Sequence, residues 1–232
     1  MYARVFKRVF DFLLSLSAVI VLFPIFLILT LIGAIAMRGN PFFTQLRPGR
    51  ICRKTGKEKI FKLVKFRTMS NARDKEGRLL PDSVRLNGYG RFLRSTSLDE
   101  LPELFNILAG HMSIVGPRPQ LVRDMVFMAE EQRRRHAVRP GLTGLAQVNG
   151  RNNITWEQKI EYDLQYIDSG IRLFRDLGII FKTVGKVLSR SDTVREGTDS
   201  DMDFGDWLMQ EGKVDQATYD EKQAEAKELL KM

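Results

Sequence analysis

The sequence predicts a mostly helical α/β protein: a re-entrant membrane helix, followed by a cytoplasmic domain of amphipathic helices and a few short strands. Three observations support this fold class. Residues 12–37 form an apolar run of 26 residues without a charge, interrupted at Pro24. Basic residues flank the run on both sides. Further along, apolar residues recur at helical spacing in several segments and at strand spacing in one.

The chain is long and apolar enough, with 232 residues and 44% hydrophobic content, for one domain with a core. We expect a membrane helix in residues 1–40, a cytoplasmic domain in residues 41–195, and an acidic tail with helical potential in residues 196–232. The tail holds 11 acids and 4 lysines, which leaves a net charge of +16 on the rest. Such a body is typical of proteins that bind phosphates, in nucleic acid, lipid headgroups or nucleotides. A single Cys52 excludes an internal disulfide framework.

The N-terminal apolar run is longer than the roughly 7 to 15 residues of a secretory signal. We therefore expect it to be retained, although Ala34-Ile35-Ala36 imitates a cleavage site. Pro24 removes a backbone donor and kinks any helix, and each arm of about a dozen residues would reach only about 18 Å. Positive charge marks both ends as cytoplasmic; it comes from Arg4, Lys7 and Arg8 before the run and Arg38, Arg47, Arg50, Arg53 and Lys54 after it. These features favour a helix that turns back at Pro24 over a straight span.

Residues 60–70, "IFKLVKFRTMS", predict a strand on which Lys65 and Arg67 share a face, and a turn-rich stretch follows. The next segment, residues 97–108, reads "SLDELPELFNIL" and predicts a helix from about Leu98 to Leu108. Ser97 and Glu100 match a capping box, and acids in a first turn suit the helix dipole. That structural role explains Glu100 fully and Asp99 partly. The alternative is that the two acids have a chemical role.

Two rigid or glycine-rich loops carry arginines. In "MSIVGPRPQ" two prolines hold Arg118 in a stiff turn, which suits an outward surface arginine as well as a phosphate clamp. Residues 138–153, "VRPGLTGLAQVNGRNN", include Arg151 and are rich in Gly and Asn. They lack the Walker pattern, so they indicate either turns or a loop that lets a diphosphate approach its backbone.

The helix predicted from Trp156 to Ile167 places Asp163 on its apolar face. A carboxylate there needs a partner, so Asp163 is either in an ion pair with an arginine or in the site. Residues 173–188 predict a further amphipathic helix, of interfacial or ordinary core type. We expect the run "RRRH" at residues 133–136 to be a solvated or lipid-facing patch.

The order of "KFRTM", "RSTSLDELPELFNIL", "MSIVGPRP" and "RPGLTGLAQVNGRN" behind a proline-broken apolar segment resembles the bacterial sugar transferases. These are monotopic phosphoglycosyl transferases that act on polyprenyl phosphate. The resemblance covers roughly residues 1–195, and its last three motifs are highly specific together. One departure is Phe23, where several small members have Ser before the proline; Ser15, Ser17 and Thr30 could replace that hydroxyl.

The resemblance implies transfer of a sugar 1-phosphate from a UDP-sugar to undecaprenyl phosphate at the cytoplasmic face of the bacterial inner membrane, the first membrane step of glycoconjugate biosynthesis. It implies that Asp99 is the nucleophile, with Mg²⁺ nearby, and that Glu100 supports it. We expect the substrates and their phosphates to be bound by Lys65, Arg94, Arg118, Arg151 and Asp163.

The expected partners are a UDP-sugar, undecaprenyl phosphate and anionic membrane lipids, without nucleic acid. A membrane-anchored basic scaffold or nucleic-acid binder without catalysis would also explain the basic body. Neither explains an acidic pair among arginine-bearing loops, and we find no nucleic-acid recognition fold or aromatic platform.

Overall fold

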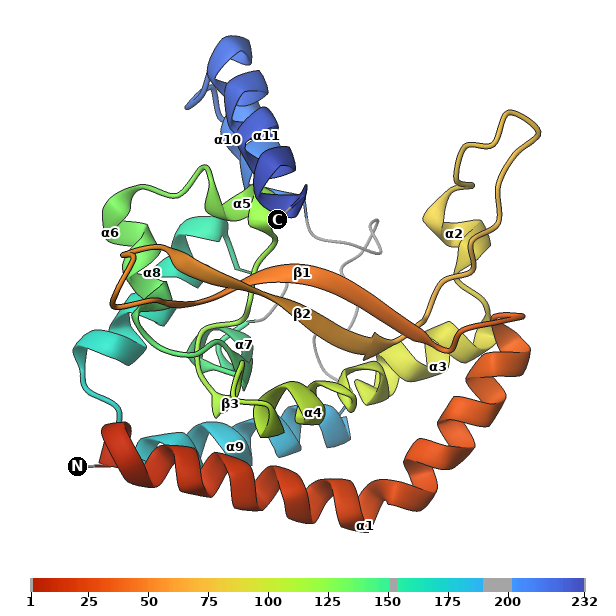
Figure 1. Cartoon of the computed structure of the whole chain (residues 1–232), viewed down its shortest axis with the longest axis horizontal. Helices are drawn as coiled ribbons and strands as arrows, with labels where there is room; N and C mark the ends of the chain where they lie inside the picture. The colour runs from red at the N-terminus through yellow and green to blue at the C-terminus, as the bar shows by residue number, and fades with distance from the viewer. Residues whose placement is uncertain (1, 151–153, 190–201, 232) are drawn as a thin grey trace.

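A computed structural model describes residues 2–150, 154–189 and 202–231 (Figure 1). After a π-helical turn, Tyr2–Phe6, the elements up to the middle of the chain are α1 (Lys7–Ala36), β1 (Phe42–Ile51), β2 (Glu58–Phe66), α2 (Asp82–Arg85), α3 (Gly88–Thr96), the 3₁₀ turn η2 (Leu98–Glu100), α4 (Glu103–Leu108) and β3 (Ser113–Val115). They are followed by α5 (Val122–Met125), α6 (Glu130–Arg133), the 3₁₀ turn η3 (Arg134–Ala137), β4 (Gly141–Thr143), α7 (Leu145–Val148), α8 (Trp156–Asp168), α9 (Leu173–Ser189), α10 (Phe204–Gln210) and α11 (Gln216–Lys231). The predicted mostly helical α/β fold is confirmed.

Helix α1 is the one helix in the described part of the chain that is long and apolar enough to cross a membrane. It contains Pro24 and bends near its middle, so that its two arms run in different directions (Figure 1). The Arg8 guanidinium in the first arm donates to the carbonyls at the end of α4. In the second arm, the carbonyls of Leu29 and Ala36 accept from Tyr89 and Asn87. Both arms therefore rest on the same domain, while insertion into a membrane stays a prediction.

The bend forms with Phe23 before the proline, and that phenyl ring is exposed. Of the hydroxyls considered as substitutes for the missing serine, Thr30 donates to the Phe26 carbonyl. This bond does not reach the carbonyl of Ile20, which Pro24 leaves without its usual helical donor.

Strands β1 and β2 form an antiparallel hairpin with Phe42 opposite Phe66 and Phe43 opposite Lys65. The predicted strand is confirmed for residues 60–66, although β2 begins at Glu58. The side chains of Phe61, Leu63 and Phe66 are buried against α1 and α4 in the main core; its other members are Phe26, Leu29, Leu93, Leu104, Ile107 and Met112. The hairpin thus places one face on the core and carries Lys65 next to α4.

The helix predicted from Leu98 to Leu108 is wrong in its first half. Residues 98–100 form a separate 3₁₀ turn, and α4 begins at Glu103 after Pro102. A proline inside a helix loses one hydrogen bond and clashes with the preceding turn. The capping box is also wrong, because Ser97 has φ +56° and ends α3, with its N–H bonded to Arg94 and Leu93 carbonyls.

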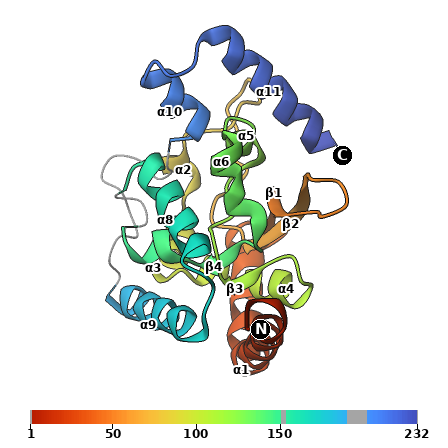
Figure 2. The same ribbon diagram turned by 90° about the vertical axis from the view of Figure 1, so that its left-hand side faces the viewer.

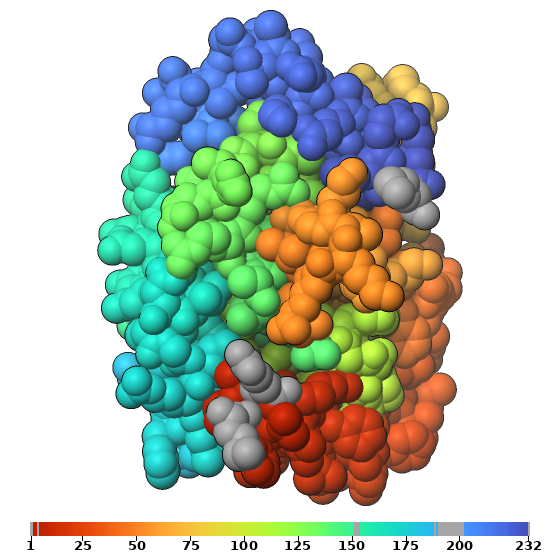
Figure 3. Space-filling model, turned by 60° about the vertical axis from the view of Figure 1, so that its left-hand side comes forward, coloured from red at the N-terminus to blue at the C-terminus, as the bar shows by residue number. Residues whose placement is uncertain are grey.

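The two ends of the molecule are formed by different pairs of helices. Helices α1 and α9 lie side by side at one end, and α10 and α11 lie at the other (Figure 2). The tail helix expected near the C-terminus is confirmed as α11, but the tail is not a free appendage (Figure 3). Phe204 is buried against Trp156, and Ala226 is buried against Val122 and Met125.

Candidate active site

The acidic pair lies in the turn between α3 and α4. Ser97 reverses the chain with its left-handed backbone, and Asp99 and Glu100 follow in the 3₁₀ turn. Left-handed backbone at a residue other than glycine is uncommon and is often found at functional sites. Glu100 is buried, whereas Asp99 is half-buried. The turn therefore gives the two neighbouring carboxylates different surroundings.

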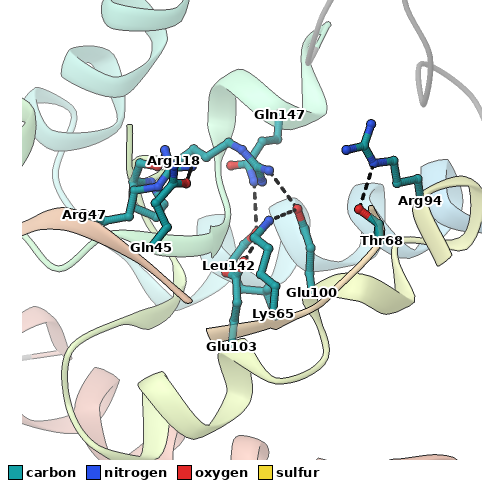
Figure 4. A network of polar contacts seen from close by, with 11 residues as sticks. Gln45, Arg47, Lys65, Thr68, Arg94, Glu100, Glu103, Arg118, Leu142 and Gln147 are labelled. Carbon is teal, nitrogen blue, oxygen red and sulfur yellow. Dashed lines mark hydrogen bonds and ion pairs between the residues drawn. The ribbon is translucent and has the colours of Figure 1, made fainter. Parts of the chain in front are cut away.

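Glu100 is held by two cations from distant parts of the chain (Figure 4). Arg118 Nη2 lies 2.7 Å and Lys65 Nζ 3.1 Å from Glu100 Oε1. Lys65 Nζ also lies 3.1 Å from Oε1 of Glu103, in the first turn of α4. Three of the residues expected from the sequence, Lys65, Glu100 and Arg118, are thus brought together. Glu103 was missed, because one acid in the first turn of a helix carries no distinctive signal.

The pKa values reflect a largely buried cluster in which two carboxylates, Glu100 and Glu103, share one lysine. Burial raises the pKa of Glu103, Lys65 opposes it and Glu100 adds to it, so that the value reaches about 6. Burial works against the charged form of Lys65, yet Glu100 and Glu103 raise the pKa of its ammonium group. The Glu100 carboxylate raises the pKa of Arg118 as well. Both cations therefore stay charged while Glu103 is poised to take up a proton.

The other expected residues are placed differently. Arg94 lies on α3 and donates from Nε to the Thr68 hydroxyl at 3.2 Å, at the side of the cluster (Figure 4). Arg151 lies outside the described residues. Asp163 does not join the cluster: it forms a buried ion pair with Arg135, the first of the two roles expected for it.

The predicted surface patch at residues 133–136 is wrong for its second half. The Arg135 and His136 side chains are buried, because Asp163 and Glu58 provide their charged partners. Arginine runs are usually solvated, and no local pattern indicates that Asp163 and Glu58, from other elements, pair with this one. Such burial is possible only where each charge is paired.

Arg47 is a further residue that sequence reasoning missed, since it was counted only as a charge flanking the membrane segment. Its guanidinium donates to the Pro119 carbonyl at 3.1 Å and to the Gln45 side chain at 2.6 Å (Figure 4). Burial lowers the pKa of Arg47 to about 10, and the neighbouring Arg118 contributes. A second arginine, from β1, thus lies close to Arg118 and holds the loop that carries it.

An apolar pocket of about 370 Å³ opens beside Glu100 and Arg118. Its walls come from elements far apart in the sequence: Ala18 and Leu22 of α1, Leu101 and Leu104, and Ile180 and Val184 of α9. Thr143 and Gln147 also line it, and the Gln147 amide donates to the Leu142 carbonyl (Figure 4). The pocket thus joins an apolar space between two helices to the charged cluster.

The described carboxylates near the pocket provide few of the ligands that a metal ion needs. Within the described residues, no group of three His, Cys, Asp or Glu side chains is arranged to hold a metal. Glu100 and Glu103 both bind Lys65, and the half-buried Asp99 next to them is the carboxylate for which the family resemblance implies a nearby Mg²⁺. Mg²⁺ is commonly bound by one or two carboxylates together with substrate phosphates. The residues present therefore fit Mg²⁺ if phosphate oxygens complete its coordination.

The chain is similar in sequence to known sugar transferases. Residues 2–190 match the bacterial sugar transferase family. The chain is 48% identical over 189 residues to an uncharacterized sugar transferase of Bacillus subtilis, covering 79% of this chain and 88% of the relative. It is 41% identical over 192 residues to the UDP-glucose:undecaprenyl-phosphate glucose-1-phosphate transferase of Klebsiella pneumoniae, covering 78% of this chain and 40% of that protein.

The Undecaprenyl-phosphate galactose phosphotransferase of Salmonella typhimurium is 33% identical over 206 residues, covering 81% of this chain and 41% of that protein. The chain thus spans about two fifths of the length of these two larger relatives. The match includes the acidic turn, the Arg118 loop and the helices around the pocket, and it ends before α10. The chain belongs to the bacterial sugar transferase family.

Proposed function

We propose that the enzyme transfers a sugar 1-phosphate from a UDP-sugar to undecaprenyl phosphate, with UMP and undecaprenyl-diphospho-sugar as products. One observation carries the proposal: the Asp99–Glu100 turn, with its cations Lys65 and Arg118, lies at an apolar pocket between α1 and α9. The cations that could bind phosphate groups thus lie next to an apolar space that could hold the lipid chain. The relatives named for undecaprenyl-phosphate transferase activity support the same reaction.

The reaction proceeds in two displacements at one phosphorus atom. An oxygen of the Asp99 carboxylate attacks the phosphorus that bears the sugar, and the bond from that phosphorus to the UMP oxygen breaks. UMP leaves, and the sugar phosphate remains on Asp99 as an acyl phosphate. A phosphate oxygen of the lipid then attacks the same phosphorus, and the Asp99 carboxylate departs. The half-buried position of Asp99 lets donor and acceptor approach in turn.

Glu100 serves the second displacement. It is buried and held from two sides by Lys65 and Arg118, so its position is fixed next to the nucleophile. A carboxylate there can take a proton from the lipid phosphate as that group attacks. Arg118, whose side chain is 34% exposed, has further N–H groups for phosphate oxygens. Arg94 and Arg151 are proposed to bind the diphosphate of the donor.

Bound Mg²⁺ would neutralise charge on the donor diphosphate and stabilise the leaving UMP. Asp99 is the residue proposed to hold it, together with substrate oxygens.

We propose that the pocket and the helices around it form the side of the protein that contacts the membrane. Phe174 and Phe181 on α9 are 85% and 72% exposed, and α1, beside it, exposes many large apolar side chains. Large exposed apolar surfaces mark sites that contact other molecules or a membrane. We propose that α1 and α9 lie in the cytoplasmic face of the inner membrane, with anionic lipids near the basic flanks of α1. The first isoprene units of the acceptor would then enter the pocket from the lipid.

The covalent intermediate is tested by intact-protein mass spectrometry. After the enzyme is mixed with a UDP-sugar but no lipid, we expect an added mass of one sugar phosphate, mapped to Asp99. The adduct should disappear when undecaprenyl phosphate is added. Asp99→Asn should keep its thermal midpoint and lose both the adduct and UMP release, whereas the exposed control Glu76→Gln should retain both. Full turnover in Asp99→Asn, or UMP release without any adduct, would indicate direct transfer. A panel of UDP-sugars in the same assay would identify the donor.

A further inference from the structure

The Arg118 loop has few backbone donors of its own, although Gly116 N donates to the Thr143 carbonyl at 2.9 Å. Pro117 and Pro119 lack N–H groups. Instead, three successive carbonyls accept hydrogen bonds from three different elements. The Pro117 carbonyl accepts from Gly141 N at 2.9 Å, that of Arg118 from Arg135 Nη2 at 2.8 Å, and that of Pro119 from Arg47 Nη1 at 3.1 Å. The loop is thus fixed from outside, and two of its three donors are arginine side chains.

Arg135 is itself fixed by Asp163. The two side chains are 1% and 2% exposed, and Arg135 Nε donates to Asp163 Oδ2 at 3.0 Å. Nη2 of the same guanidinium bonds to this oxygen too, so one nitrogen joins the Asp163 carboxylate to the Arg118 carbonyl. The planar fork of an arginine can hold both acceptors at once, which a lysine ammonium on a flexible stem does less well.

The energetics of this pair indicate a role other than stability. A buried ion pair roughly breaks even against a pair of apolar side chains, because desolvation costs several kcal/mol for each charge. Here Asp163 Oδ1 and Arg135 Nη1 are buried without a hydrogen-bond partner in the described part of the chain. Apolar residues of similar size would fill the space at no greater cost. What they could not do is hold the Arg118 carbonyl.

We propose that Asp163 and Arg135 are positioning residues, which fix the backbone of the Gly116–Pro119 loop and so keep the Arg118 guanidinium on Glu100. This inference rests on the proposed function for its catalytic part only. The contact chain runs from Asp163 on α8 through Arg135 on η3 to Arg118, and from Arg118 to Glu100. A shift of about 1 Å in a catalytic group can cost about 100-fold in rate.

The test is the double variant Arg135→Met, Asp163→Leu, which removes both charges and keeps the volume. We expect a thermal midpoint equal to that of the parent or above it. Amide hydrogen exchange of residues 114–121 should speed up about tenfold or more, because the Arg118 carbonyl has lost its donor. UMP release should fall about 10- to 100-fold in kcat, with a smaller change in KM for the donor. The matched control is Arg133→Met, which removes a neighbouring arginine whose partner is Glu58, away from the loop.

A second variant covers the case in which the double variant does not fold. Arg135→Lys keeps a positive charge beside Asp163 but cannot bridge both acceptors, so it should show the same faster exchange and lower kcat in a folded protein. Unchanged exchange in the loop of either folded variant would overturn the proposal, as would faster exchange with full turnover. If the parent released no UMP from any UDP-sugar, the proposed function would fail, while the exchange result would still decide whether this pair holds the loop.

Discussion

Two buried glutamates in this protein, Glu58 and Glu103, have the same solvent exposure but opposite pKa shifts. Both side chains are 3% exposed. Burial alone would raise the pKa of Glu58, yet hydrogen bonds from His136 and Arg133 lower it to about 2. The pKa of Glu103 is instead raised to about 6. Solvent exposure is equal, but Glu103 lies deeper in the protein than Glu58, so the opposite pKa shifts reflect both the depth of burial and the partners.

Glu58 has two hydrogen-bonding partners of its own, whereas Glu103 shares its one cation, Lys65, with Glu100. The Arg133 guanidinium binds both oxygens of Glu58, and His136 Nδ1 lies 3.1 Å from one of them. Glu103 has Lys65, which also binds Glu100. The Glu58 cluster thus gives its carboxylate two partners, whereas in the Lys65 cluster Glu103 shares its one cation with Glu100 and therefore binds a proton more readily. This difference distinguishes a supporting ion pair from a reactive site.

The largest expected effect comes from neutralising one acid in each cluster. Glu100→Gln keeps the shape of the side chain and an oxygen for Arg118, but it removes the basic carboxylate. We expect kcat to fall about 100- to 10,000-fold, with a smaller loss of thermal midpoint than in Glu58→Gln, because Lys65 keeps Glu103 as a partner and the Arg118 side chain is partly exposed. Glu58→Gln should do the reverse, lowering the midpoint while turnover below it is retained, because Arg133 and His136 lose an ionised partner.

Steady-state UMP release and thermal unfolding of both variants measure these effects side by side. Turnover near the parent level in Glu100→Gln would remove Glu100 from the chemistry. An equal loss of turnover in Glu58→Gln, measured well below its midpoint, would show that the two clusters do not differ in function.

The sequence predicted those parts of the site whose signal is local. Lys65, Glu100 and Arg118 come from short motifs, and the bend in α1 follows from Pro24, since a proline acts on its own helix. The amphipathic helices α8 and α9 follow from periodicity. Asp163 was placed correctly on a buried face, but periodicity does not name a partner.

What could not be predicted depends on long-range packing. Arg135 is 28 residues from Asp163 along the chain, and it stands in a basic run that resembles a solvated patch. The pocket exists only because α1 and α9, from opposite ends of the matched region, lie side by side. The capping box failed because Ser97 was already committed to ending α3, which the spacing of Ser97 and Glu100 does not reveal.

A smaller effect is expected when the cation of each cluster is removed. Lys65→Met leaves Glu100 and Glu103 close together without their shared ammonium group. We expect the free energy of unfolding to fall by about 2 to 3 kcal/mol. Breaking a fully buried ion pair costs about 3 to 5 kcal/mol, and the loss here is smaller because the Lys65 side chain is 17% exposed. Arg133→Met should cost about 1 kcal/mol, since His136 still lies beside Glu58.

Denaturant unfolding at pH 7.5 measures both losses. The double variant Lys65→Met, Glu103→Leu is the control: it should recover most of the stability, because it also removes Glu103, the carboxylate left without a cation, while Glu100 keeps Arg118. Equal losses in the two single variants would mean that sharing a cation makes no difference to the cluster.

The smallest effect is on how stability depends on pH. The pKa of Glu103 in the folded state, about 6, lies above its ordinary value of 4.5. Its contribution to stability is therefore fully present below pH 4.5 and is lost as the pH rises through 6. Glu58 behaves in the opposite way: its contribution is present above pH 4.5 and is lost as the pH falls toward 2.

Thermal midpoints of the parent and of Glu103→Gln, measured from pH 4.5 to 7.5, separate these contributions. Over this range the parent should lose stability relative to Glu103→Gln, by on the order of 1 to 2 kcal/mol, because only the parent must ionise a buried carboxyl group. Glu58→Gln should run parallel to the parent in this window and diverge from it below pH 4.5. Parallel curves for the parent and Glu103→Gln up to pH 7.5 would mean that Lys65 fully compensates Glu103, and the contrast between the two glutamates would then disappear.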